Sequence, residues 1–300
     1  MALCLLISRR CNLRCGFCDV EFTGQDMSRQ TAKAAIAGYL NASREERPRV
    51  KFFGGEPLLN WDLVREIVDA GRREWSARGL TFDLMTNGAY LDAPKRRYLL
   101  KRPEVSVTVS FPAPGAATLP GVWFTMALER DRSPRAVLRR FLGLVRSGYR
   151  QFNFLPAYYQ PWTKAQVSEL RRSFAGLAEM IARLRRRGVP LRLKNAETLG
   201  SVPLFNDVTT VDVDGSIYAS NMVQCEGMER ARRSLKLGHV SQPAALAGGR
   251  GPDPELIRDL VRRWAGPAAW KGTLRVDEAL GEFVRSLEAT QGARALAGVS

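Results

Sequence analysis

Three cysteines lie within eight residues near the start of the chain, at Cys11, Cys15 and Cys18, in the spacing C-x3-C-x2-C. They follow an apolar run, residues 3–7, that has the length of a buried strand. Thiolates this close together are ligands for zinc or for an iron–sulfur cluster. Structural zinc usually takes four nitrogen or sulfur ligands, and the one histidine, His239, is distant in sequence. A [4Fe–4S] cluster held by three thiolates leaves one iron open, so the spacing favours a reactive iron–sulfur cluster.

A second motif, Gly54-Gly55-Glu56-Pro57, follows a short apolar run at 50–53. Glycine lets a backbone approach a ligand or another backbone closely, because it has no Cβ atom. A carboxylate such as Glu56 attracts an ammonium group through a charge-assisted hydrogen bond. Both motifs follow strand-length runs, and the carboxyl ends of parallel strands meet at the edge of the sheet where ligands bind. The two motifs therefore predict one ligand site.

Apolar runs of strand length alternate with amphipathic runs of helix length over roughly the first 200 residues. Six such pairs in a row predict a parallel sheet with right-handed crossovers. Six are too few to close an eight-stranded barrel, so the predicted fold class is α/β, a partial (β/α)6 barrel. Residues 113–131 carry several glycines and prolines and are expected to form an irregular loop over the barrel mouth. The expected strands are 3–7, 50–53, 81–85, 105–111, 152–155 and 190–194.

The pattern changes after residue 200, which predicts two domains: the partial barrel over 1–200 and a small mixed C-terminal extension over 201–300. In the extension, two short apolar runs flank Asp214-Gly215, a pair typical of the turn in a β-hairpin. Two helices are expected after the hairpin, at about 254–264 and 276–288.

The cysteine spacing, with Phe17 before the last cysteine, resembles the signature of the radical S-adenosylmethionine (radical SAM) superfamily. The Gly-Gly-Glu-Pro motif is similar to that family's methionine-binding motif, and the order of elements is similar over about residues 3–200. The resemblance implies that the three cysteines hold one [4Fe–4S] cluster and that S-adenosylmethionine (AdoMet) binds its open iron. The cluster would reduce the sulfonium, and the resulting 5′-deoxyadenosyl radical would abstract hydrogen from a substrate. The AdoMet-binding residues that it implies are Phe17, Gly54, Gly55, Glu56, Pro57, Asn87, Ser110 and Asn153, whereas the catalytic residues are unknown.

Residues 209–218 resemble the hairpin that opens the SPASM-like extension of peptide-modifying members and anaerobic sulfatase maturases, where auxiliary clusters are bound. In those relatives a cysteine follows the equivalent of Tyr218, but here Ala219 and Ser220 stand there, and only Cys225 lies downstream. The extension is therefore expected to be degenerate and to hold no second cluster. The resemblance implies a ribosomally made peptide or peptide-like natural product as substrate, with a small-molecule natural product or RNA as alternatives. The reaction subclass stays open between an oxidoreductase, an isomerase and a carbon–carbon or carbon–sulfur bond-forming enzyme.

The formal net charge of the 300-residue chain is +16, which suits a polyanionic partner such as RNA, DNA or an acidic peptide. The arginines, however, recur in pairs on nearly every expected helix, as they do on solvated helix faces. A nucleic-acid partner is therefore not favoured. The non-enzyme alternative is a metal-stabilised nucleic-acid-binding protein without turnover.

Five cysteines, three of them clustered, do not suit the even-numbered disulfide framework of a small secreted protein. No apolar run reaches the ~18 residues that a membrane-spanning helix needs. We therefore expect a cytoplasmic protein without a membrane partner. The electron donor that the family resemblance implies is a low-potential flavodoxin or ferredoxin.

Overall fold

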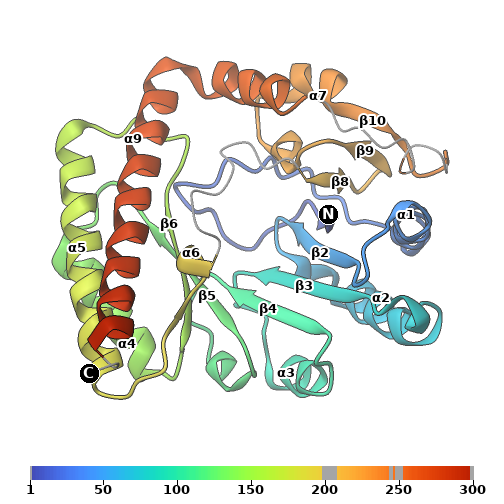
Figure 1. Cartoon of the computed structure of the whole chain (residues 1–300). Helices are drawn as coiled ribbons and strands as arrows, with labels where there is room; N and C mark the ends of the chain where they lie inside the picture. The colour runs from blue at the N-terminus through green and yellow to red at the C-terminus, as the bar shows by residue number, and fades with distance from the viewer. Residues whose placement is uncertain (1, 198–207, 243–245, 247–252, 298–300) are drawn as a thin grey trace. The chain divides into compact units, whose positions relative to one another are not determined.

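The computed structural model of the chain describes residues 2–197, 208–242, 246 and 253–297 (Figure 1). The chain forms two compact units. The first unit contains residues 1–109, 113–119 and 203–264, and the second contains 110–112, 120–202 and 265–300. Both units thus combine segments that are far apart in sequence.

The first unit is built on one sheet, with strand order β10-β9-β8-β1-β2-β3-β4. Strands β1 to β4 pair in parallel, and β8 pairs in parallel with β1 on its other side. Strands β8 and β9 form the expected antiparallel hairpin, and β10 pairs with β9. The strands are β1 (Ala2–Ser8), β2 (Arg49–Gly54), β3 (Thr81–Thr86), β4 (Val105–Val109), β8 (Thr209–Val211), β9 (Ser216–Tyr218) and β10 (Lys236–His239).

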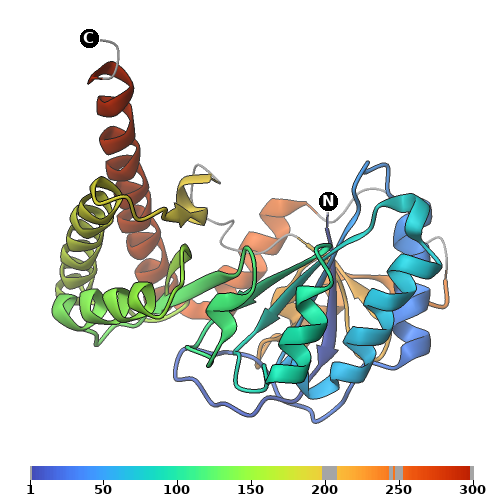
Figure 2. The same ribbon diagram turned by 90° about the horizontal axis from the view of Figure 1, so that it is seen from below.

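Helices α1, α2 and α3 lie along one side of strands β1 to β4, as Figure 2 shows. Ser28 caps α1 by accepting a hydrogen bond from the Thr31 amide, and Asp92 caps α3 in the same way from the Lys95 amide. The helices of this unit are α1 (Arg29–Ala42), α2 (Trp61–Arg73), α3 (Ala93–Leu100) and α7 (Glu229–Leu235), with 3₁₀ turns η1 (Pro57–Asn60), η2 (Ser76–Arg78), η3 (Ala116–Thr118) and η4 (Asn221–Gln224).

The second unit pairs β5, β6 and β7 in parallel. Its core is aromatic: Phe152 and Phe154 of β6 pack against Phe141, and Phe154 and Phe174 pack against Phe283. Helix α9 changes direction at Gly266, which has φ 74°, and the part after this glycine belongs to the second unit. The elements are β5 (Trp123–Leu128), α4 (Pro134–Arg146), β6 (Gln151–Pro156), α5 (Lys164–Arg186), β7 (Arg192–Leu193), α6 (Lys194–Glu197) and α9 (Pro254–Ala297).

Two expectations about the strands were wrong. Residues 113–131 are not an irregular loop, because they contain β5, in which Phe124, Met126 and Leu128 alternate inward and are almost fully buried. The flanking glycines and prolines hid this alternation in the sequence. The expected strand at 190–194 shrinks to β7, since α6 begins at Lys194.

The α/β fold class, with its mainly parallel sheet, is confirmed. The predicted domain boundary at residue 200 lies outside the described residues and stays a prediction. In the part of the chain that the structure describes, no helix is both long enough and apolar enough to cross a membrane.

Candidate functional site

Three segments meet where parallel strands β1, β2 and β3 end. Residues 9–26, here called the cysteine loop, follow β1, and the Gly54-to-Pro57 motif begins as β2 ends. Thr86-Asn87-Gly88 follows β3 in the same way. The three strands are parallel neighbours, so their carboxyl ends lie at one edge of the sheet. The segments that follow them therefore lie at that edge too.

Gly54 and Gly55 let the end of β2 touch the segment that leads into the cysteines. The Gly55 amide donates to the Ser8 carbonyl at 2.8 Å, and the Glu56 amide donates to the Arg10 carbonyl at 2.8 Å. A Cβ atom on Gly54 would lie 2.4 Å from the Ser8 oxygen, and one on Gly55 would lie 2.2 Å from the Arg10 oxygen. Gly54 also has φ 116°, a region that favours glycine. The glycines therefore permit this approach of two backbones, whatever they do for a cofactor.

Glu56 has no exposed surface, and its carboxylate organises the next strand end. Oε1 accepts hydrogen bonds from the Leu58 amide at 2.9 Å and from the Thr86 hydroxyl at 2.7 Å. Oε2 accepts from the Asn87 amide at 2.7 Å. Burial raises the pKa of Glu56, and these three donors offset part of that rise. Glu56 thus fixes the turn after β3, and its predicted contact with an ammonium group stays a prediction.

Asn87 contacts the cysteine loop directly. Its Nδ2 donates to Asn12 Oδ1 at 2.8 Å and lies 3.9 Å from the Cys11 sulfur. Its own Oδ1 accepts from the Ala89 amide at 2.9 Å. The sequence predicted Asn87 as an AdoMet contact, and the structure brings it beside the first predicted cluster ligand.

The three cysteines lie on one loop, with Cys11 and Cys15 half-buried and Cys18 exposed. The Cys18 amide donates to the Cys15 carbonyl at 3.0 Å, and the Leu13 amide donates to the Cys11 sulfur at 3.4 Å. Phe17, half-buried, lies in the same loop. The structure thus collects Cys11, Cys15, Cys18 and Phe17 with the Gly54-to-Pro57 motif and Asn87 in the first unit.

Ser110 and Asn153 belong to the second unit. Ser110 is half-buried and directly follows β4, and Asn153 lies opposite Thr125 in the β5–β6 pair. Their predicted contacts with AdoMet stay predictions.

Arg9 was missed by sequence reasoning, although it directly precedes Arg10 and the first ligand position. Its side chain is 3% exposed and forms an ion pair with Asp212 at 2.6 Å. The signal in the sequence was a charged residue between a buried strand and the cysteines. Such a residue needs a partner when it is buried, but nothing in the sequence names that partner.

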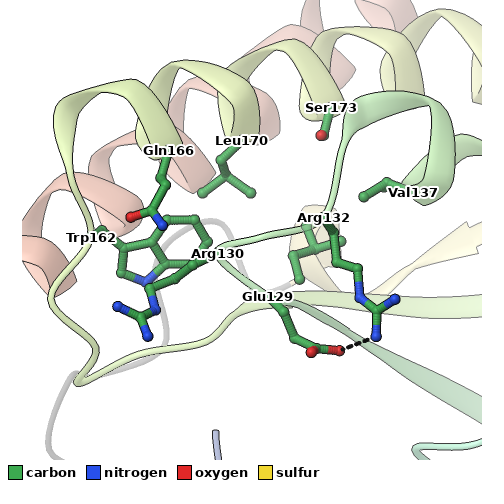
Figure 3. A pocket seen from close by; sticks show the side chains of 9 residues that line it. Glu129, Arg130, Arg132, Val137, Trp162, Gln166, Leu170 and Ser173 are labelled. Carbon is green, nitrogen blue, oxygen red and sulfur yellow. Dashed lines mark hydrogen bonds and ion pairs between the residues drawn. The ribbon is translucent and has the colours of Figure 1, made fainter. Parts of the chain in front are cut away.

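The second unit has a small pocket at the carboxyl end of β5 (Figure 3). Leu128, Val137 and Leu170 form its apolar wall, and Glu129 and Arg132 form an ion pair at its rim, at 3.5 Å. Trp162 lines the pocket, is 3% exposed, and donates from Nε1 to the Ala157 carbonyl.

In a comparison with protein families, residues 5–158, just over half of the chain, match the Radical SAM superfamily. The chain belongs to the radical SAM superfamily. It is therefore an enzyme that uses AdoMet and a [4Fe–4S] cluster. This excludes the non-enzyme alternative of a nucleic-acid-binding protein without turnover.

Among known proteins, an uncharacterized protein of Methanocaldococcus jannaschii is 33% identical over 109 residues, which is 36% of this chain and 37% of the relative. The radical SAM cyclopropyl synthase TigE of Paramaledivibacter caminithermalis is 29% identical over 131 residues, 38% of this chain and 27% of TigE. The matches thus span roughly a third of these relatives. In fold, the chain is similar to native anSMEcpe, solved with bound AdoMet and the Cp18Cys peptide, with TM-score 0.73, 13% identity, and coverage of 97% of this chain and 99% of that chain.

The donor set at the strand ends suits an iron–sulfur cluster, which takes thiolate ligands. Three thiols come from one short loop, and the Asn87 amide reaches the first of them. Within the described residues, no three His, Cys, Asp or Glu side chains converge in a way that would hold a single metal ion. A cluster does not require such convergence, because each thiolate binds a different iron.

We expect Gly55→Ala to destabilise the protein, because its Cβ atom would overlap the Arg10 carbonyl. The free energy of unfolding should fall by about 1–3 kcal/mol, as for other overpacked positions, and urea denaturation measures it. Gly143→Ala is the control, since a Cβ atom there, within α4, meets no atom within 4 Å. Alanine should be neutral or stabilising by up to ~1 kcal/mol in a helix. An equal effect at the two glycines would contradict the role assigned to Gly55.

Glu56→Gln should also lower the free energy of unfolding, by about 1–3 kcal/mol, because one oxygen becomes an amide that cannot accept its hydrogen bond. The amide of Asn87 or the donors at Oε1 would then face another donor. Exposed Glu46→Gln is the control and should change stability by less than ~0.5 kcal/mol. Urea denaturation of both variants tests this, and an unchanged Glu56→Gln protein would refute the network.

Proposed function

We propose that this radical SAM enzyme abstracts hydrogen from a ribosomally made peptide or a peptide-like natural product. The main support is the similarity to anSMEcpe, which extends over nearly the whole of both chains and whose structure holds a peptide together with AdoMet. A second support is the hairpin of β8 and β9, because its sequence resembles the hairpin that opens the extension of peptide-modifying members. A small-molecule natural product and RNA are the alternative substrates.

Cys11, Cys15 and Cys18 are the proposed cluster ligands. When bound, the cluster supplies the electron that cleaves AdoMet to a 5′-deoxyadenosyl radical. The protein's part is to hold the loop and the neighbouring strand ends in place. Asn87 lies against Cys11, Glu56 fixes Asn87, and Gly55 joins the end of β2 to the residues before the loop. All eight predicted AdoMet contacts remain proposals: Phe17, Gly54, Gly55, Glu56, Pro57, Asn87, Ser110 and Asn153.

A single cluster follows from this assignment. The chain has five cysteines, and after the three proposed ligands only Cys4 and Cys225 are left. Cys4 is fully buried within β1, and Cys225 is 7% exposed after η4. Two thiols are too few for a second [4Fe–4S] cluster with cysteine ligands. We therefore favour a reaction that needs one cluster, such as an epimerisation, a rearrangement or carbon–carbon bond formation, with electrons from a flavodoxin or ferredoxin.

The Cys15→Ala variant tests the ligand assignment. After anaerobic reconstitution, the wild-type protein should hold about four irons per chain, as one [4Fe–4S] cluster requires. With dithionite and AdoMet it should form 5′-deoxyadenosine, and Cys15→Ala should lose both the cluster and this product. Cys4→Ala, in the core of β1, is the matched control and should keep both. A Cys15→Ala protein with a wild-type cluster and product would overturn the assignment.

The substrate class has a separate test. The rate of 5′-deoxyadenosine formation is measured in the presence of candidate short peptides, of nucleotides and of RNA. Stimulation by a peptide, with transfer of deuterium from the labelled peptide into 5′-deoxyadenosine, would support the proposal. Stimulation by nucleotides or RNA alone would contradict it.

A further inference from the structure

The cysteine loop is closed at its base by β1. The Met27 amide donates to the Ile7 carbonyl at 2.9 Å, and the Arg9 amide donates to the Gln25 carbonyl at 2.7 Å. The Ser8 hydroxyl donates to Asp26 Oδ1 at 2.6 Å. These bonds fix where the loop leaves and rejoins the sheet, but they lie outside the stretch that carries the three cysteines.

A second connection lies just after the last cysteine, and its partner comes from the C-terminal extension. Val20 pairs with Cys225 in an isolated antiparallel bridge. On either side of it, the Glu21 amide donates to the Gln224 carbonyl at 2.8 Å, and the Glu226 amide donates to the Asp19 carbonyl at 2.8 Å. Residues 19–21 are thus held as a short strand against residues 224–226.

The Arg9 side chain joins this connection to the base of the loop. Its Nε and Nη2 donate to the two oxygens of Asp212 at 2.9 and 2.6 Å, and its Nη1 donates to the Gln224 carbonyl at 2.9 Å. Arg9 is 2% exposed and Asp212 is 7% exposed. Asp212 is itself fixed in the hairpin turn, where its amide donates to the Ser216 carbonyl.

Arg232 of α7 provides a further tie to the same stretch. Its Nε donates to the Val223 carbonyl at 2.7 Å, and its Nη2 forms an ion pair with Glu21. Arg9 Nη1 also donates to the Glu21 carbonyl at 3.5 Å, so two arginines join Glu21, after Cys18, to residues 223–224 of η4.

These contacts are charged and directional, whereas apolar side chains would be enough to pack the two segments together. A buried ion pair gains little net stability over a well-packed apolar pair, because both charges lose their hydration. A two-pronged arginine–carboxylate contact does fix distance and orientation, since its hydrogen bonds are parallel and directional. In some proteins, buried ion pairs favour one conformation of the chain over its alternatives. Here the ion pairs act on Arg9, just before Cys11, and on Glu21, just after Cys18.

We propose that Asp212 and Arg232 are positioning residues for the [4Fe–4S] cluster. Acting through Arg9 and Glu21, they hold both flanks of the ligand stretch in the spacing that the cluster needs. This gives the extension a role in a protein with one cluster: it sets the geometry of the first cluster instead of holding a second. The inference rests on the proposed ligands Cys11, Cys15 and Cys18.

Three variants test this proposal. Asp212→Asn removes the charge that pairs with Arg9. The double variant Arg9→Met/Asp212→Leu replaces the buried pair by apolar groups, a change that often leaves stability intact. Asp214→Asn, in the same turn and exposed, is the matched control, because asparagine keeps an oxygen that accepts from the Ser216 amide, as Asp214 Oδ1 does at 2.8 Å. The denaturation midpoint in urea identifies the variants that fold like the wild type.

The readouts report on the loop and the cluster, not only on activity. In the protein without cluster, hydrogen exchange of the Glu21 and Glu226 amides should be at least about tenfold faster in Asp212→Asn and in the double variant, which corresponds to ~1.4 kcal/mol of lost protection. After reconstitution, both should hold fewer irons, and the electron paramagnetic resonance spectrum of the reduced cluster, with and without AdoMet, should differ from that of the wild type. Asp214→Asn should match the wild type throughout.

A double variant with the wild-type denaturation midpoint, exchange rates, iron content and spectrum would overturn the proposal. That failure is distinct from failure of the ligand assignment. If Cys15→Ala loses the cluster while the double variant keeps a wild-type one, the ligands stand and the positioning role falls. If Cys15→Ala keeps the cluster, the assignment itself is wrong, and the positioning role falls with it.

Discussion

Two backbone hydrogen bonds, from Gly55 to Ser8 and from Glu56 to Arg10, join neighbouring strands at the point where both leave the sheet. The rest of the site depends on this contact. It requires positions without side chains, because a Cβ atom on either glycine would overlap a carbonyl oxygen. It also fixes the backbone from which Glu56 extends its carboxylate to the third strand end. The three strand ends are thus connected one after another. The end of β1 contacts the end of β2 through backbone hydrogen bonds, and the end of β2 contacts the end of β3 through the Glu56 carboxylate.

Much of this site could be predicted because its signals are local. The cysteine spacing and the Gly-Gly-Glu-Pro motif each occupy a few consecutive residues, and the strand before each one marks its position in a parallel sheet. The caps at Ser28 and Asp92 are equally local. Strand β5 was missed because the glycines and prolines on its N-terminal side are typical of a loop. Its alternating Phe124, Met126 and Leu128 were nevertheless visible in the sequence.

The role of Glu56 and the pairing of Arg9 could not be predicted in the same way. The sequence predicts that Glu56 contacts a ligand, and that contact stays a prediction. The three protein donors to its oxygens, from Leu58, Thr86 and Asn87, are visible only in the folded arrangement. Arg9 and Asp212 are 203 residues apart. One sequence holds no information on which distant carboxylate such an arginine meets, because pairing across the fold is set by topology.

The connection between residues 19–21 and 224–226 also has a consequence for how the protein is made. Both Arg9 and the cysteines emerge from the ribosome long before Asp212 does. At ordinary translation speeds of about 5–20 residues per second, a separation of 203 residues corresponds to roughly 10–40 seconds. During that interval the nascent chain carries its three thiols on a stretch that lacks its partner segment. On the proposed assignment of the three cysteines as ligands, the loop that carries them reaches its final shape only after residues 212–226 have emerged from the ribosome.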